Sequence, residues 1–188
     1  MKKKIVFTFD YELFFGKSGS IDNCLIKPTD MLLDAFKECN ATATFFVDST
    51  HLLMLRKEGL TEDYNRISNQ ICRMAKEGHE VALHIHPHWV DAKYKDGMWY
   101  FPDYTHYKIG SCSRDELSVL FEQCVNLLTS IVRSVDANYR VQSFRAGGWC
   151  IDPFANIKEL FEKYDIKVDS SVIPFRKCVG NSISSYDY

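Results

Sequence analysis

The sequence of 188 residues has no long uninterrupted hydrophobic run and no Cys-x-x-Cys pair among its seven cysteines. The apolar stretch behind the basic start Lys2–Lys4 meets Asp10 and Glu12 at once. It is therefore shorter than the roughly 7–15 apolar residues of a signal-peptide core. No segment reaches the roughly 20 apolar residues that a membrane helix needs. We therefore expect no membrane span, reduced thiols and a cytoplasmic protein.

The sequence also lacks a strong charge imbalance, an internal repeat, a low-complexity segment and a linker. Its formal net charge of -2 gives no reason to expect a nucleic acid partner. The hydrophobic content of 46% and the aromatic content of 14% are typical of an ordered globular protein. A chain of this length can bury a substantial core, so we expect a single domain over residues 1–188.

Short β-branched or aromatic segments alternate along the chain with amphipathic helical segments. The expected strands cover residues 4–9, 42–47, 80–85, 141–144 and 166–168. Expected helices begin near Thr29 and Thr50, end at Gly78, and follow a capping box at Ser113 and a proline at Pro153. Segments 11–28 and 86–112 read as loops, and the second is rich in aromatic residues, which favours a functional role. The alternation predicts an α/β fold with a parallel sheet, whose ligands bind beyond the carboxyl ends of the strands.

Three alternate histidines lie at the end of the expected strand 80–85 and indicate a metal site. They are His84, His86 and His88. Imidazole is a common ligand of divalent metals, and a bend at Pro87 could turn His84 and His88 toward one ion. The pair His84 and His86 is the alternative, but the hydrolases with that pattern need further histidines, and none follows His106. His79 lies at the beginning of the strand, so we interpret it as structural.

Two carboxylates follow the first expected strand, Asp10 and Glu12, with Tyr11 expected to point away from them. They are either solvated charges or a functional pair, in which one binds the metal and the other is a general base. Arg145 follows the fourth expected strand, where a buried guanidinium is costly unless it is paired. Asp10 is the expected partner. The glycines of Gly147–Gly148 would let the backbone approach a substrate closely.

These segments resemble, in order, the motifs of the polysaccharide deacetylase family, the NodB-homology carbohydrate esterases. The matching segments are Thr8–Asp10, Gly78–Glu80 with His84-x-x-x-His88, Phe144–Arg145 and Asp169–Ser171. The resemblance spans essentially the whole chain. It implies a distorted (β/α) barrel that removes acetyl groups from N-acetylated sugars with a divalent metal ion, often zinc. Because that barrel normally needs another strand or two, we expect the domain to be incomplete at its C-terminus.

The resemblance also implies a metal-ligand set. His84 and His88 resemble the two histidine ligands of the family. The common third ligand is the second of two adjacent aspartates, but Tyr11 occupies that position here. Some members use Asp-x-Asp instead, so Glu12 is the expected third ligand. His86 has no assigned role and could contact the substrate, support the site or replace a proton donor.

Further roles follow from the same resemblance. Asp10 resembles the catalytic base, Arg145 the arginine that positions the base, and Asp169 the aspartate that tunes the catalytic acid. We expect the carbohydrate substrate to contact three residues, which are Trp89, Gly147 and Trp149. The family's catalytic-acid histidine lies in a late motif, and this chain has no histidine after His106.

The Asp-x-Glu and His-x-His-Pro-His variants are similar to a branch associated with lipopolysaccharide and surface-glycan biosynthesis. The predicted function is metal-dependent removal of an acetyl group from an N-acetylated sugar in such a pathway. One alternative is an amidase acting on a small non-sugar amide. Another is a non-catalytic relative that binds a metal or a glycan, which the absence of a late histidine favours.

Overall fold

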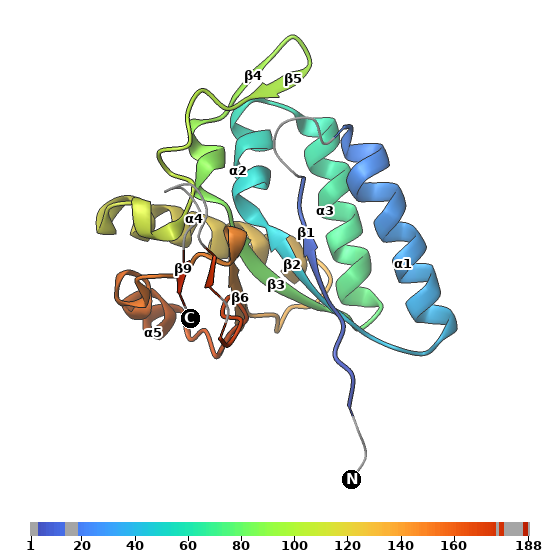
Figure 1. Cartoon of the computed structure of the whole chain (residues 1–188). Coiled ribbons are helices and arrows are strands. Elements are labelled where there is room, and N and C mark those ends of the chain that lie inside the picture. Colours follow the sequence, from blue (N-terminus) through green and yellow to red (C-terminus); the bar gives the residue numbers. More distant parts are fainter. Residues whose placement is uncertain (1–3, 14–18, 176, 179–185, 188) are drawn as a thin grey trace.

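A five-stranded parallel sheet forms the centre of the computed structural model, which describes residues 4–13, 19–175, 177–178 and 186–187 (Figure 1). Its strands, in spatial order, are β1 (Thr8–Tyr11), β2 (Thr44–Asp48), β3 (Glu80–Ile85), β6 (Ser143–Ala146) and β7 (Val168–Asp169). Every neighbouring pair is parallel, which confirms the predicted α/β class. The spatial order equals the chain order, as along the wall of a (β/α) barrel. Over the described residues the sheet is open, so closure into a barrel stays a prediction.

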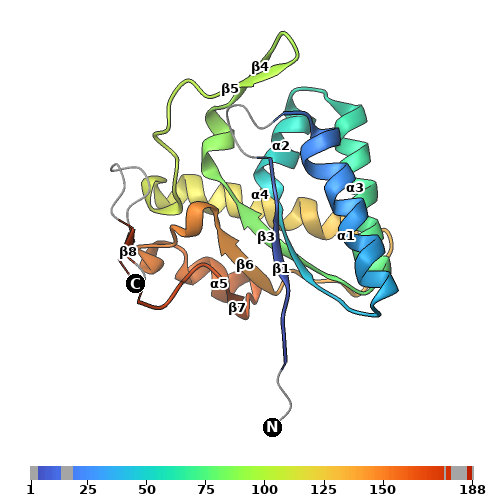
Figure 2. The same ribbon diagram turned by 45° about the vertical axis from the view of Figure 1, so that its right-hand side comes forward.

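Helices connect the strands and cover the sheet (Figures 1 and 2). They are α1 (Lys27–Glu38), α2 (Ser49–Lys57), α3 (Thr61–Lys76), α4 (Arg114–Arg133) and α5 (Lys158–Tyr164). Helices α1 and α3 lie side by side, and Arg73 of α3 forms ion pairs with Asp30 and Asp34 of α1 at 2.9 and 2.5 Å. No helix in the described part of the chain is long and apolar enough to cross a membrane.

The alternation of side chains along β3 separates the hydrophobic core from the face that carries polar chemistry. Val81, Leu83 and Ile85 belong to the main hydrophobic cluster beneath the helices. Successive side chains of a strand point to opposite faces, so Ala82 and His84 lie on the other face. Both sets are buried. This burial of both faces explains why the strand is apolar almost throughout, as expected for a parallel sheet.

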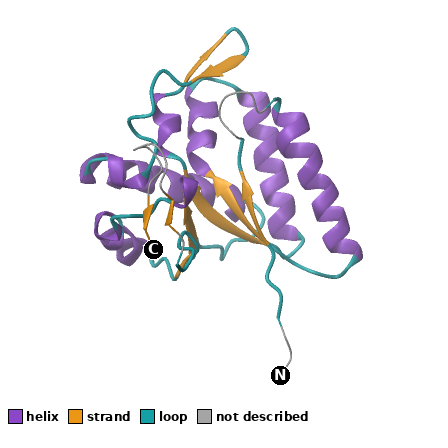
Figure 3. Ribbon diagram, in the orientation of Figure 1, coloured by secondary structure: helices purple, strands orange, loops and turns teal. Residues whose placement is uncertain are grey.

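The structure corrects two segments that the sequence analysis predicted as loops. Segment 11–28 contains a π-helical turn, η1 (Asp22–Ile26), that runs into α1, and residues 14–18 lie outside the described part. Segment 86–112 contains two 3-10 turns, η2 (Pro87–Asp91) and η3 (Ile109–Ser111), and a hairpin of β4 (Lys93–Lys95) and β5 (Met98–Tyr100) (Figure 3). The remaining described elements are η4 (Gly147–Trp149), η5 (Phe154–Asn156), β8 (Lys177–Cys178) and β9 (Tyr186–Asp187).

Candidate metal centre

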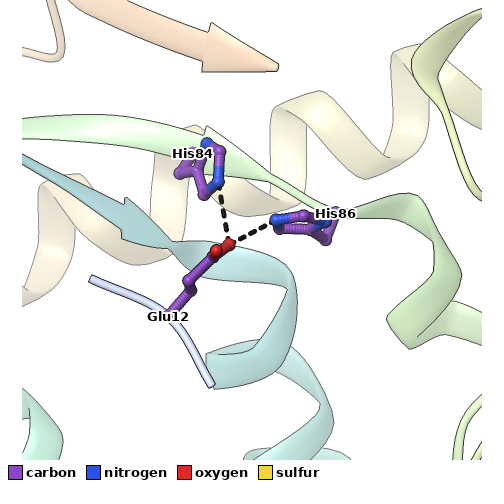
Figure 4. A group of neighbouring side chains, drawn as sticks. All are labelled: Glu12, His84 and His86. Carbon is purple, nitrogen blue, oxygen red and sulfur yellow. Dashed lines mark hydrogen bonds and ion pairs between the residues drawn. The ribbon is translucent and has the colours of Figure 1, made fainter. Parts of the chain in front are cut away.

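Glu12, His84 and His86 meet at the carboxyl ends of the first and third strands (Figure 4). One ligand atom from each lies within 4.8 Å of the others. The Glu12 carboxylate oxygen Oε2 is 3.1 Å from His84 Nε2 and also contacts His86 Nε2. Glu12 follows β1, whereas both histidines come from the end of β3, so the parallel topology brings them together across β2.

The hydrogen bond of His84 on its other nitrogen makes this residue suitable for metal binding. His84 Nδ1 lies 2.7 Å from the backbone carbonyl oxygen of Arg145, its neighbour in the sheet register. A carbonyl oxygen only accepts, so Nδ1 carries the proton, and in the neutral ring Nε2 keeps its lone pair. Nε2 lies 3.1 Å from the Glu12 carboxylate, where it can hydrogen-bond to the carboxylate or, with its lone pair free, bind a cation beside it.

Charge in the group is balanced between Glu12 and His86. Burial alone would raise the pKa of Glu12, but hydrogen bonds with His84 and His86 hold it well below its usual range. Burial alone would lower the pKa of His86, but its hydrogen bond with Glu12 and the nearby charge of Asp48 raise it. Without a metal ion Glu12 therefore favours a proton on the His86 ring. A divalent cation can take the place of that proton, so the donor set fits zinc.

Tyr11 points away from the group, as predicted from its position between two acidic residues. Its side chain is 3% exposed, and its hydroxyl donates to Gln70 Oε1 at 2.7 Å, within the core. Because side chains alternate along a strand, Asp10 and Glu12 then face the site. Both line a pocket of about 90 Å³ together with the histidines.

The predicted pairing of Asp10 with Arg145 is present. Arg145 Nη1 donates to Asp10 Oδ1 at 2.6 Å, and Nη2 donates to Ser170 Oγ at 2.8 Å and to Thr8 Oγ1 at 3.1 Å. The guanidinium carbon also lies 4.0 Å from the ring centroid of Phe46. These contacts fix the position of the guanidinium group. The guanidinium group in turn orients the Asp10 carboxylate.

Asp169 lies at the end of β7, and its side chain is occupied by Ser171. Its Oδ1 accepts the backbone N–H of Ser171 at 3.2 Å and its hydroxyl at 2.5 Å. Ser171 Oγ in turn accepts the N–H of Ala146 at 2.8 Å. This chain of contacts ties β7 to the end of β6. The role predicted for Asp169 in tuning a catalytic acid stays a prediction.

His86, which had no assigned role, is the second histidine of the group, whereas His88 lies beside it. The ring centroids of His86 and His88 are 4.9 Å apart, and both residues line the 90 Å³ pocket. Burial lowers the pKa of His88 to about 3, so its ring is neutral, as a metal ligand requires. The assignment of His88 as a ligand stays a prediction, and the observed cluster adds His86 as a competing candidate.

The three predicted substrate contacts have different surroundings. Trp89 is 2% exposed and stacks on His51 at 4.4 Å, so its burial does not support a substrate contact. Gly147 is buried against His86, and a Cβ atom there would lie 2.5 Å from His86 Nδ1. The absent side chain thus makes room for the imidazole. Trp149 is half-buried at the end of η4, and its role stays a prediction.

Asp48 is a buried acid beside the site that the sequence analysis missed. It ends β2 opposite His84 in the register and is 2% exposed. Its Oδ1 accepts the N–H groups of Thr50 and His51 at 3.2 and 3.3 Å, and Oδ2 has no hydrogen-bond partner among the described residues. Burial raises its pKa. An Asp-Ser-Thr run after an apolar strand is an N-cap signal that could have identified it.

A family model matches most of the chain. Residues 1–150 match the family model described as polysaccharide deacetylase. No curated protein matches the chain.

Several solved structures are similar to the fold at low sequence identity. The peptidoglycan N-acetylglucosamine deacetylase Bc1960 has a TM-score of 0.51 and 19% identity over 87% of this chain and 55% of its own. The polysaccharide deacetylase Bc1974 from Bacillus cereus has a TM-score of 0.51 and 17% identity over 89% and 60%. A CE4 family pseudoenzyme from Bacillus anthracis has a TM-score of 0.52 and 12% identity over 89% and 43%. The chain thus spans about half the length of these proteins, and the likeness concerns the fold alone.

Proposed function

The chain belongs to the polysaccharide deacetylase family, and from this premise we propose that it is a metal-dependent deacetylase acting on an N-acetylated sugar. The observation that carries the proposal is the convergence of Glu12, His84 and His86 beside the Asp10–Arg145 pair. A metal-ligand group and an oriented carboxylate in one pocket are the two parts that hydrolysis of an amide requires.

We assign the residues separate tasks. A divalent ion held by Glu12 and the histidines, with zinc as the proposed metal, supplies Lewis acidity toward the acetyl carbonyl. Asp10 takes a proton from the attacking water, and its hydrogen bond with Arg145 holds the Asp10 carboxylate in the orientation for this step. Positioned acid–base groups of this kind contribute roughly 10²–10⁴-fold to the rate.

The proposed biological setting is lipopolysaccharide or surface-glycan biosynthesis in the cytoplasm. Two sequence features support it, the Asp-x-Glu spacing and the His84–His88 run with its proline. The proposed substrate is therefore an N-acetylated amino sugar, free in a glycan or linked to a nucleotide.

A second candidate function is metal or glycan binding without turnover. The fold of this chain is similar to that of a CE4 family pseudoenzyme. The Asp10–Arg145 pair argues for turnover, because a binding protein has no need of an oriented base. An amidase acting on a small non-sugar amide would use the same residues and differ only in its substrate.

The test measures acetate release and zinc content together. Wild-type protein with zinc should release acetate from N-acetylglucosamine oligomers or from the nucleotide-linked sugar. Asp10→Asn should keep its zinc and lose activity at least about 100-fold, whereas Glu12→Gln should lose both. Glu159→Gln, an exposed change on α5, is the control. Zinc binding without acetate release would favour the binding protein, and absence of zinc after its addition would reject the metal site.

A further inference from the structure

Phe46 is a fully buried aromatic side chain that packs outside the main hydrophobic core. It is 2% exposed and lies within β2. Among the described residues, the main hydrophobic cluster includes its neighbour Phe45 but not Phe46. Successive side chains of a strand point to opposite faces, so the Phe46 ring lies on the face of the sheet that carries the metal site. Its burial is therefore explained by a partner on that face.

That partner is the guanidinium group of Arg145. The guanidinium carbon lies over the Phe46 ring, 4.0 Å from the ring centroid. The face of an aromatic ring attracts a cation, and the attraction is strongest where water is excluded. Arg145 is 8% exposed and Phe46 is 2% exposed, so water is largely excluded from this contact.

The three nitrogen atoms of the same guanidinium group are held by hydrogen bonds. Nη1 donates to Asp10 Oδ1 at 2.6 Å, and Nη2 donates to Thr8 Oγ1 at 3.1 Å. Ser170 accepts from Nη2 with its hydroxyl oxygen at 2.8 Å and from Nε with its carbonyl oxygen at 3.1 Å. These bonds set the direction in which the group points, and the Phe46 ring limits how far it can move toward the sheet.

The strand register explains why β2 supplies this ring. Phe46 lies opposite Asp10 in the pairing of β1 with β2. Arg145 belongs to β6, so its side chain crosses β3 and β2 to reach Asp10. On β3 the register places Ala82, a small residue, beside Phe46. Phe46 therefore lies next to the proposed base and in contact with the arginine that orients it.

From these contacts we propose that Phe46 is a positioning residue, whose ring holds the Arg145 guanidinium group where it orients the Asp10 carboxylate. The inference rests on the proposed deacetylase function, in which Asp10 is the base, and adds a residue that acts on the base through the arginine. Phe46 is not among the described residues that line the metal-site pocket. Its ring should therefore affect the chemical step without contributing to the binding of substrate or zinc.

The first test is Phe46→Leu, which keeps an apolar side chain and removes the ring face. We expect kcat to fall about 10–100-fold, because a small displacement of a catalytic group has this cost, with KM and zinc affinity unchanged. Phe46→Met, with a more adaptable side chain, repeats the test if the leucine variant does not fold. The matched control is Phe45→Leu, which makes the same change on the core face of β2 and should retain the wild-type kcat. A folded Phe46 variant with wild-type kcat overturns the proposal, and so do equal losses at the two positions.

Action through the arginine is tested by combining Phe46→Leu with Arg145→Gln. If the ring acts by holding Arg145, the leucine change should lower kcat less than about twofold once the arginine is replaced. Losses that multiply, as at two independent sites, would show a general effect on the packing of the sheet and overturn the proposal.

The same four proteins separate this proposal from the function on which it rests. Urea denaturation of the wild type, the two single variants and the double variant measures the coupling between ring and guanidinium without any turnover. We expect a coupling of roughly 3–30-fold in the unfolding equilibrium constant, as for a buried cation–π contact. If the wild type releases no acetate but this coupling is found, the deacetylase function fails and the contact of Phe46 with Arg145 stands. Absence of coupling in an enzyme that releases acetate overturns the role of Phe46 and leaves the function intact.

Discussion

At the scale of single residues, the two carboxylate oxygens of Asp48 have different surroundings. Oδ1 caps α2 through the N–H groups of Thr50 and His51, whereas Oδ2 is buried near the histidines of the site. Asp48→Ala removes the cap and should lower the free energy of unfolding by about 1 kcal/mol in urea denaturation. Asp48→Asn keeps a capping oxygen and should change it by less than about 0.5 kcal/mol.

The carboxyl group of Asp48 predicts a separate effect on the metal. A buried carboxylate beside His84 and His86 favours a nearby cation. Changes just outside a metal-ligand group typically cost 10–100-fold in affinity, so both Asp48 variants should bind zinc about tenfold or more weakly by competition with a chelator. If zinc affinity falls only in Asp48→Ala, the effect comes from the cap and not from the charge.

The identity of the second histidine ligand can be decided by two alanine variants. The structure places His86 against Glu12, whereas the family resemblance points to His88. We expect His86→Ala to lower zinc affinity more than about 100-fold, beyond the range for residues that only support a ligand, and His88→Ala to lower it about 10–100-fold. The reverse order would restore His88 as the ligand and leave His86 in a supporting position.

The residue scale also shows which features of the site could be predicted from sequence. The Asp10–Arg145 contact was predictable, because a buried guanidinium needs a charged partner and few were available. The position of His86 was not. It depends on the backbone turn at Pro87 and on the missing side chain of Gly147, which leaves room for the ring. Sequence spacing does not encode those angles.

At the scale of elements, α4 begins at the capping box that the sequence predicted. Ser113 Oγ accepts the N–H of Glu116 at 3.3 Å, and the Glu116 carboxylate accepts the N–H of Ser113 at 2.9 Å. Ser113→Ala should therefore lower the free energy of unfolding by about 1 kcal/mol, measured by urea denaturation. Ser118→Ala, inside the same helix, is the control and should not destabilise. Equal behaviour of the two variants would contradict a stabilising cap.

Local sequence patterns predicted the bounds of one strand correctly, whereas the bounds of another depend on its pairing with a neighbouring strand. Strand β3 has the predicted bounds, because each of its ends is marked in the sequence. The first strand was predicted over 4–9, but β1 is Thr8–Tyr11, and Ile5 and Val6 are 78% and 75% exposed. Ile5 and Val6 are β-branched and favour an extended backbone. They still form no strand here, because in this segment β2 pairs only with Thr8–Tyr11.

The hairpin β4–β5 could have been predicted from a turn-forming pair of residues within the aromatic-rich segment. Asp96 and Gly97 form its turn with φ values of 52° and 77°. Positive φ at both positions is typical of a type I′ turn, which an Asp-Gly pair favours. The hairpin allows Trp99 to pack against Trp89 at 5.2 Å, so part of the aromatic segment is core.

At the scale of the whole molecule, the strands of the parallel sheet stand in the order in which they occur along the chain. Each connection between successive strands of this sheet contains one or two α-helices and returns the chain to the neighbouring strand, which gives β1-β2-β3-β6-β7. The alternation of strands and helices in the sequence predicted a parallel sheet covered by helices, and the family resemblance predicted a barrel. The alternation could not predict whether β1 and β7 approach each other, since closure depends on the tilt and stagger of all strands together.

The metal site also couples function to the stability of the whole fold. A ligand that binds the folded state alone stabilises it by about 2.7 kcal/mol at a free concentration of 100 times Kd. For a chain of this size each kcal/mol shifts Tm by roughly 2–4 °C. Saturating zinc should therefore raise Tm by roughly 5–11 °C. Glu12→Gln, which removes a proposed ligand, should show no such rise.

The rise in Tm on zinc binding should depend on pH, because zinc and a proton compete for His86. In the zinc-free protein Glu12 and Asp48 raise the pKa of His86 against the opposing effect of burial. A raised pKa of His86 in the folded state stabilises the fold. This contribution to the free energy of unfolding is fully present below the pKa of about 6.5 that histidine has in the unfolded chain, and it is lost as pH rises through the higher pKa of the folded state. Zinc must displace the same proton, so the rise in Tm should be larger at pH 8 than at pH 5.5. An equal rise at both values would place zinc away from His86 and its partner Glu12.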